Sequence, residues 1–115
     1  MQDPLRNFKA EFFKALAHPA RIKILETLRS DELSVTELQA HLGVDASSVS
    51  QHLSVLRHKN IVDSRKVGTT VYYRIQDAEI LELLEVARRI FNNHLVNARS
   101  TLEQMEDENI ASSQN

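Results

Sequence analysis

The stretch SVTELQAHLGVDASSVSQHLSVL, residues 34–56, contains the signals of two helices joined by a tight turn. Its first four letters form a capping box, in which the Ser34 hydroxyl caps a helix and Glu37, three residues later, reaches back to the cap. Two leucines follow on the inner face of this helix, and Gly43 suits the left-handed residue that ends it. The stretch therefore predicts a short helix that stops at a defined place.

The second helix of this stretch has one apolar side and one polar side. Asp45 can cap it, and the helix is expected to end near Asn60. Its apolar side recurs at helical spacing, at Val49, Leu53 and Leu56. Many of the other positions carry short hydrogen-bonding side chains: Ser47, Ser48, Ser50, Gln51 and His52. Such a face is either an ordinary solvated surface or a surface that recognises donors and acceptors on a partner.

Two further helices are predicted before this stretch. A first helix is indicated by apolar side chains that recur every three or four residues, Leu5, Phe8, Phe12 and Leu16. His18 and Pro19 end that helix, and Pro19 suits the first position of the next one, which continues to about Ser30. His18 is interpreted as a helix cap.

A β-hairpin and a long helix are predicted after Asn60. Residues 61–67 and 70–76 are rich in β-branched and aromatic side chains, and a Gly68-Thr69 turn separates them. Asp77 can cap the last helix. An apolar seam follows that helix at spacings of three and four, through Ile80, Leu84, Ala87, Phe91, Leu95, Ala98, Leu102 and Met105.

Together these elements predict a winged helix-turn-helix fold. The class is mainly α with a β-hairpin wing (α+β), in the order α-α-α-α-β-β-α. Residues 1–107 are expected to form one domain, because no linker or internal repeat interrupts them. The polar, aperiodic residues 108–115 predict a disordered tail.

The composition argues against several classes of protein. The 115 residues are 42% apolar and 26% charged, as in ordinary globular domains. No apolar run approaches the roughly 20 residues of a membrane span and no secretory signal is found, so a cytoplasmic protein without membrane contact is expected. Cysteine is absent, which excludes disulfides and thiolate sites. No nucleophile–base pair, phosphate-binding glycine loop or carboxylate cluster indicates an enzyme, and no cofactor is expected.

The basic charge is concentrated in the segment that holds the second helix of the stretch and the hairpin. The net charge of the whole chain is −2. Residues 47–75 carry five basic side chains and one acidic one, whereas residues 76–115 carry three basic and eight acidic ones. A phosphate backbone would be attracted to the first of these segments and repelled by the second.

Double-stranded DNA is the expected partner of the basic segment. In a helix-turn-helix the second helix enters the major groove, where hydroxyl, amide and imidazole groups can meet base edges. The residues predicted to contact DNA from this helix are Ser47, Ser48, Ser50, Gln51, His52 and Arg57. Those predicted from the hairpin are Arg65, Lys66, Thr69, Thr70 and Tyr72. Phosphate contacts from such a hairpin set register more than sequence choice.

Three segments resemble, in the same order, the pattern of the ArsR/SmtB family of bacterial winged-helix repressors. They are KALAHPARIKIL (14–25), ELSVTELQAHLGVDASSVSQHLSVLRHKNIV (32–62) and RKVGTTVYYRI (65–75), and the resemblance covers roughly residues 8–91. It implies a homodimer, held by the first and last helices, that binds an imperfect inverted-repeat operator and blocks transcription until an effector loosens it. The residues that it places in the dimer interface are Leu5, Phe8, Phe12, Ile80, Leu84, Ala87, Phe91, Leu95, Ala98 and Leu102.

The sensing sites of that family are not retained at the matching positions. The thiolate pair of its arsenic and cadmium sensors falls at Ser34 and Thr36. The zinc pattern of the last helix, Asp-x-His followed ten residues later by His-x-x-Glu, meets Asp77, Glu79, Ile90 and Asn93. One ligand is kept, one is replaced by a carboxylate and two are lost, and imidazole is the ligand that selects such metals.

Three functions remain open from the sequence. The first is a dimeric DNA-binding repressor without the usual metal and thiol sites, whose signal is unknown. The second is a metal-responsive repressor with a rewired oxygen and nitrogen site at Asp77, Glu79 and His94, with His58 as a further candidate. The third is a winged helix that binds a protein partner and not DNA.

Overall fold

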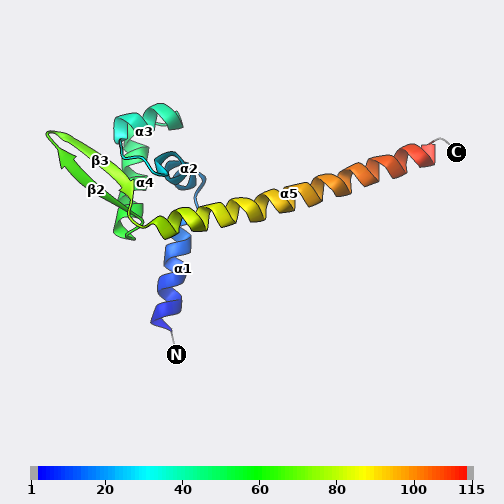
Figure 1. Cartoon of the computed structure of the whole chain (residues 1–115), viewed down its shortest axis with the longest axis horizontal. Helices are drawn as coiled ribbons and strands as arrows, with labels where there is room; N and C mark the ends of the chain where they lie inside the picture. Colours follow the sequence, from blue (N-terminus) through cyan, green and yellow to red (C-terminus); the bar gives the residue numbers. More distant parts are fainter. Residues whose placement is uncertain (1–2, 114–115) are drawn as a thin grey trace. The chain divides into compact units, whose positions relative to one another are not determined.

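The computed structural model describes residues 3–113, apart from the side chains of residues 96–98 and 110–113. The elements follow in the order α1 (Pro4–Leu16), α2 (Pro19–Leu28), β1 (Leu33–Ser34), α3 (Val35–Leu42), α4 (Ala46–His58), β2 (Val62–Val67), β3 (Thr70–Ile75) and α5 (Ala78–Ser113) (Figure 1). The predicted class, mainly helical with a β-hairpin wing, is confirmed. The chain forms two compact units, one up to Leu81 and one from Glu82, where the sequence predicted a single domain over residues 1–107.

The predicted caps define where the helices begin and end. The Nδ1 atom of His18 accepts a hydrogen bond from the backbone N–H of Ala20 at 3.2 Å, which caps α2. In the capping box of α3, the Glu37 N–H donates to the Ser34 hydroxyl, and the Ser34 N–H donates to the Glu37 carboxylate, both at 3.2 Å. Gly43 ends α3 with a φ of 69°, a left-handed conformation in which a β-carbon would be strained.

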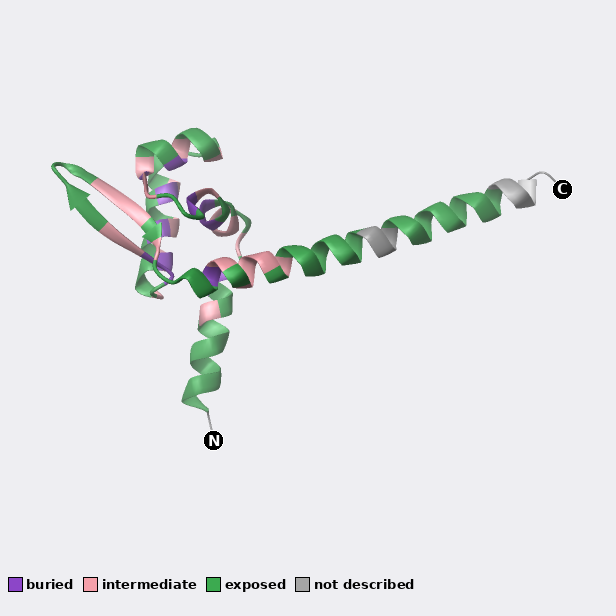
Figure 2. Cartoon of the chain, in the orientation of Figure 1, coloured by how far each residue is buried: buried purple, intermediate pink, exposed green. Residues whose placement is uncertain are grey.

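The core of the first unit is built from α2, α3, α4 and the start of the hairpin. Figure 2 colours buried residues along the inner faces of these helices, and the largest fully buried side chains are Ile24, Leu25, Leu28, Leu38, Val49, Leu53, Leu56, Ile61 and Val62. Burying one such side chain contributes about 1.5–3 kcal/mol relative to leaving it exposed. This cluster fixes α4 against α2 and α3, and so determines which side of α4 faces outward.

The wing is part of a three-stranded antiparallel sheet in the order β1-β3-β2. The hairpin of β2 and β3 closes through Gly68 and Thr69, with a φ of 64° at Gly68, as a glycine at the first central turn position allows. The sequence did not predict β1, which pairs Leu33 with Tyr73 and Ser34 with Tyr72. Two residues are too short to display a period of their own, so only the pairing with β3 reveals the strand.

The helix α5 begins at the predicted cap and extends further than predicted. The Asp77 carboxylate accepts a hydrogen bond from the backbone N–H of Glu79 at 2.9 Å. The helix continues to Ser113, whereas the sequence predicted a disordered tail from residue 108; residues 114–115 lie outside the described part. The helix has neither glycine nor proline to interrupt it, since the last of each in the chain are Gly68 and Pro19.

Candidate nucleic-acid interface

The helix α4 presents a polar face directly opposite its buried one. Its successive side chains are rotated by about 100° around the helix axis. The face opposite Val49, Leu53 and Leu56 therefore carries Ser47, Gln51, Ser54 and His58, all of which are exposed. Ser47 and Gln51 lie where the sequence placed them. Ser54 and His58 were not among the predicted DNA contacts, although they lie three and seven residues after Gln51 and therefore on the same stripe.

Ser48 lies at the start of α4 and takes part in its cap. Its backbone N–H donates to the Asp45 carboxylate at 3.0 Å, and its hydroxyl donates to the same carboxylate at 2.8 Å. The hydroxyl hydrogen bond from Ser48 is the main cause that lowers the pKa of Asp45 below its usual value. Ser48 was predicted as a DNA contact, and here it stabilises the N-terminus of the helix.

His52 was also predicted as a DNA contact, but it lies on the flank of α4 and is half-buried. Its Nδ1 atom accepts a hydrogen bond from Nε of Arg21 at 3.3 Å. Its ring lies 4.5 Å from the ring of His18, centroid to centroid. Burial, followed by the nearby His18 and Arg21, lowers the pKa of His52 below its ordinary value. His52 therefore contacts α2 within its own chain.

Ser50 and Arg57 occupy the other flank of α4, and both are exposed. Arg57 lies in the last turn, where a cation complements the negative end of the helix dipole. No ion-pair partner of Arg57 is found among the described residues. After this turn Asn60 adopts a φ of 59°, and the N–H of Ile61 bonds to the carbonyl of Leu56 at 2.9 Å, which ends the helix and leads the chain into β2.

The predicted wing residues are divided between the turn and the two faces of the hairpin. Thr69 lies in the turn and Thr70 directly after it, and both are exposed. Arg65 lies opposite Tyr72 and Lys66 opposite Val71. Because opposed residues share a face and neighbouring residues alternate, Arg65 and Tyr72 lie on one face and Lys66 on the other. A partner that contacts one face of the wing therefore lies closer to Arg65 or closer to Lys66, and cannot contact both in the same way.

Ion pairs neutralise part of the basic charge of the wing. Nε of Arg65 donates to the carboxylate of Glu32, a residue 33 positions earlier in the chain, and this bond raises the pKa of Arg65. Arg74 donates to Asp63 across the hairpin at 2.8 Å, which raises the pKa of Arg74. Lys66 has no ion-pair partner among the described residues. It is therefore the wing cation most available to an external phosphate.

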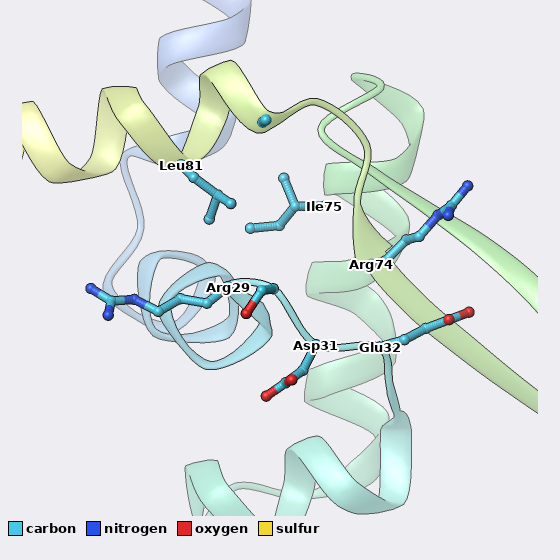
Figure 3. Close-up of a pocket in the computed structure, with 8 residues that line it drawn as sticks. Arg29, Asp31, Glu32, Arg74, Ile75 and Leu81 are labelled. Atoms are coloured by element: carbon cyan, nitrogen blue, oxygen red, sulfur yellow. The ribbon is translucent and has the colours of Figure 1, made fainter.

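An open hollow of about 310 Å³ lies beside the loop that joins α2 to β1 (Figure 3). Its wall carries charges of both signs and apolar side chains, from residues that include Arg29, Asp31, Glu32, Arg74, Ile75 and Leu81. Glu32 and Arg74 are already paired with Arg65 and Asp63. A ligand in this hollow would therefore find the charges of Glu32 and Arg74 already paired.

Apolar side chains are exposed on α1, within the first unit. Leu5 and Phe8, two of the predicted interface residues, are more than 60% exposed. Phe12 is half-buried, and its ring forms a T-shaped pair with that of Phe13 at a centroid distance of 5.6 Å. Phe13 is itself 55% exposed and was not predicted, because it lies off the regular stripe.

Apolar side chains are also exposed on α5, within the second unit. Phe91, Leu95, Leu102 and Met105 are 56–65% exposed, and Leu84 and Ala87 are partly exposed. The side chain of Ala98 lies outside the described residues. Ile80 precedes this unit, and it was predicted as an exposed interface residue, which the structure does not bear out. It is 7% exposed and belongs to the core of the first unit.

The candidate metal ligands are not brought together in the described part of the chain. Within residues 3–113, no group of three or more histidine, aspartate or glutamate side chains has a geometry that could hold a metal ion. Asp77 is used as the cap of α5, and Glu79 and His94 are both exposed. In the same part of the chain, no helix combines the length and the apolar character needed to cross a membrane.

Comparison with known proteins gives consistent matches. Residues 18–64 match the model of a family described as bacterial regulatory protein, arsR family. The HTH-type transcriptional regulator Rv0081 of Mycobacterium tuberculosis is 44% identical over 104 residues, which cover 90% of this chain and 91% of the relative. A transcriptional repressor SmtB homolog of Synechocystis is 42% identical over 74 residues, or 64% of this chain and 56% of the relative.

Solved structures give the same result. The crystal structure of Rv0081 superposes with a TM-score of 0.77 at 45% identity, over 84% of this chain and 97% of that one. A solution structure of Mb0332 from Mycobacterium bovis is described as a homodimeric winged helix-turn-helix DNA-binding domain. It superposes with a TM-score of 0.74 at 28% identity, over 82% of this chain and 91% of that one.

Proposed function

The chain belongs to the ArsR family of bacterial transcriptional regulators, and we propose that it is a dimeric repressor that binds an imperfect inverted-repeat operator in the cytoplasm. In this proposal α4 is the recognition helix, which enters the major groove. The turn of the hairpin contacts the neighbouring backbone. The matched residues 18–64 include the whole of α3 and α4, the two helices on which the proposal depends.

The observation that carries the proposal is the outward face of α4. Its exposed stripe consists of hydroxyl, amide and imidazole groups, and its opposite side is fixed in the core by three fully buried residues. A rigidly held helix with short polar side chains can approach base edges closely, and Gln51 can offer a bidentate amide to adenine. The relative Mb0332, which has the same fold, is described as a DNA-binding domain.

The exposed apolar side chains of α1 and α5 support the homodimer. Single exposed apolar residues are common, but several large ones at helical spacing are typical of an interface. The predicted interface residues that are exposed or partly exposed are Leu5, Phe8, Phe12, Leu84, Ala87, Phe91, Leu95 and Leu102. A twofold dimer also matches the inverted repeat, since each subunit would hold one half-site.

The signal that releases the operator is not assigned by this proposal. A rewired metal site at Asp77, Glu79 and His94 is the second candidate. Against it stands the use of the Asp77 carboxylate as a helix cap, 2.9 Å from the Glu79 N–H. We therefore favour a regulator without the usual metal and thiol sites of the family, and the test below includes a metal arm.

The proposal is tested by selecting bound sequences from a random DNA pool, once with metal-free protein and once with zinc. The expected result is the same inverted repeat in both pools, with half-sites about 10 base pairs apart, centre to centre, or a multiple of that spacing. Enrichment that zinc abolishes would favour the metal-responsive repressor. A pool without any enriched sequence would overturn the DNA-binding function and favour a protein partner.

Repression is tested separately, with the selected repeat placed over a promoter that drives a reporter. Expression of the protein is expected to lower reporter output, because a bound dimer would exclude polymerase from an overlapping site. Increased output with the same arrangement would assign activation, and the DNA-binding part of the proposal would stand.

Replacing Gln51 with alanine is expected to cost about 1–3 kcal/mol of operator affinity and to relax base preference at one position. The reason is that the amide lies in the middle of the outward face, where it can make two hydrogen bonds to one base. Titration of fluorescent duplexes measures the change. Gln76→Ala, at an exposed position outside the helix, is the matched control. An equal loss of affinity for operator and random DNA would contradict a base-reading role for Gln51.

Replacing Lys66 with alanine is expected to weaken binding to all duplexes about equally and to reduce the salt slope by about one. Lys66 has no ion-pair partner among the described residues, so its charge is available to a phosphate. Affinity measured from 50 to 200 mM salt gives the slope. Lys23→Ala, an exposed lysine on α2, is expected to leave the slope unchanged. A loss confined to the operator would instead make Lys66 a base contact.

A further inference from the structure

Arg21 links the end of α1 to the recognition helix. Its Nη1 atom donates to the backbone carbonyl of Ala15 at 3.2 Å, and its Nε donates to Nδ1 of His52 at 3.3 Å. Ala15 and Leu16, at the end of α1, are buried, and Arg21 and His52 are partly buried. The guanidinium of Arg21, a residue of α2, thus bridges α1 and α4, and His52 lies 31 residues after Arg21 in the chain.

We propose that Arg21 is a positioning residue for the recognition helix and that its contact with His52 makes operator recognition sensitive to protonation. This rests on the proposed role of α4 in DNA recognition. His52 lies one residue from Gln51 and four from Ser48, so a displacement of its ring moves the first turns of the outward face. Nothing in the local sequence indicates this role, because Arg21 lies on another helix.

The direction of the hydrogen bond determines which nitrogen of His52 carries the proton. An arginine can only donate, so Nδ1 of His52 must be the acceptor and must be unprotonated. The single proton of the neutral ring is then on Nε2. The Nδ1 atom of His18 likewise accepts from the N–H of Ala20 at 3.2 Å, and the rings of His18 and His52 are tilted by 53° to each other.

Protonation of His52 breaks the hydrogen bond between Arg21 and His52. The charged imidazolium has a proton on Nδ1 and can no longer accept from Arg21. It also places a second positive charge against the Arg21 guanidinium and beside His18. Arg21 must then leave its position, and the support that it gives to the recognition helix is lost.

Among the residues that the structure describes, no carboxylate contributes to the pKa shift of His52 by favouring the charged ring. Its pKa is lowered by burial, by His18 and by Arg21, in that order. The elements packed against α4 are α1, α2, α3 and β2. Their other charged or titratable groups do not contribute to the shift: Arg6, Lys9, Glu11, Lys14, Lys23, Glu26, Glu37, His41, Asp63, Arg65 and Lys66. Nor do Arg57 and His58 on α4 itself.

The sign of the pH dependence follows from the lowered pKa. Because the pKa of His52 is lower in the folded chain than in the unfolded one, its contribution to stability is fully present above the unfolded value. That contribution is lost as the pH falls through the folded value. Operator recognition should therefore weaken in mildly acidic solution. Ordinary exposed histidines have the opposite effect, since their added charge strengthens binding to any DNA.

The first part of the test needs no DNA. Ring ¹H–¹⁵N spectra of the full chain, titrated from pH 8 to pH 5, give the tautomer and the pKa of each histidine. We expect His52 to be protonated only on Nε2 at neutral pH and to titrate below the ordinary range of histidine. The backbone amides of α4 should shift together with His52. Arg21→Met should raise the pKa of His52, because it removes a neighbouring positive charge.

The second part measures the ratio of affinities for the selected operator and for a random duplex of equal length. The ratio cancels the general effect of charge on DNA binding. It is expected to fall by up to about a hundredfold per pH unit below the pKa of His52, the limit for two protons, one on each subunit of the proposed dimer. His52→Gln, whose amide oxygen can still accept from Arg21 but does not titrate, should give a flat profile. The control His41→Gln should keep the wild-type profile.

Each outcome decides the proposal. It is overturned if His52 titrates in the ordinary range of histidine, if the α4 amides do not respond, or if His52→Gln keeps the pH dependence of the ratio. A ratio that rises on acidification would overturn it as well. If no duplex is bound at any pH, the proposed function fails, and the spectra still decide whether Arg21 positions α4 through His52.

Discussion

Replacing Leu53 with alanine is expected to lower the free energy of unfolding by about 2–5 kcal/mol. Leu53 is fully buried on the inner side of α4, in the same cluster as Leu25, Leu28 and Leu56. Removal of three heavy atoms loses their transfer free energy and leaves a cavity that the surrounding helices fill only in part. Since domains of this kind are stable by about 5–15 kcal/mol, the loss is a large fraction of the total.

Urea unfolding monitored by circular dichroism measures this change. The midpoint is expected to fall while the slope with denaturant stays the same, which separates lost stability from a change in the unfolded state. The wild-type protein and the Leu53→Ala variant must be compared at the same protein concentration, since association adds to apparent stability. Ser54→Ala, the next residue and an exposed one, is expected to change the free energy by less than about 0.5 kcal/mol. An equal effect of the two substitutions would contradict the assigned orientation of α4.

Replacing Leu95 with glutamate is expected to yield monomers that bind the selected operator at least about 100-fold more weakly. In the proposed dimer this exposed leucine of α5 is covered by the partner, and twofold symmetry would bury two unpaired carboxylates at once. A monomer holds one half-site only and loses the gain of about 10²–10⁴ that linkage of two binding sites provides. Sedimentation velocity gives the mass, and duplex titration gives the affinity.

Asn93→Glu is the matched control for this experiment. It adds the same charge to the same helix, but two residues before Leu95 and thus about 160° away around the axis. It should remain dimeric and keep its operator affinity. Helical content measured on both variants checks that α5 is retained, and Leu102→Glu provides a second position on the seam. If Leu95→Glu and Leu102→Glu both stay dimeric, the interface lies elsewhere.

Local signals in the sequence were sufficient for most of the fold. The capping box of Ser34 and Glu37, the left-handed Gly43 and the Asp45 cap were all predicted, and each is made by residues within a few positions of one another. The same is true of the hairpin turn at Gly68 and of the Asp77 cap. Apolar periodicity also identified the buried side of α4, because the period of a helix is a property of the chain itself.

Two departures from prediction have a common cause, which is contact between residues far apart in the chain. The strand β1 exists through its pairing with β3, about 40 residues later. Ile80 satisfied the pattern of an exposed seam, but it is covered by the core of the first unit. The length of α5 differed for another reason, because polar composition by itself does not end a helix that lacks glycine and proline.

The sequence by itself therefore determined every element (except β1), the helix caps, the buried side of each helix in the core and the concentration of basic residues around the proposed interface. The tertiary structure decided which of those polar residues point outward. His52 and Arg65 look alike in the sequence as exposed candidates for DNA contact, but Arg21 and Glu32, 31 and 33 residues away, hold them within the chain. Hydrogen bonds and ion pairs of this kind depend on the distance between side chains in space, and residue type and periodicity do not encode that distance.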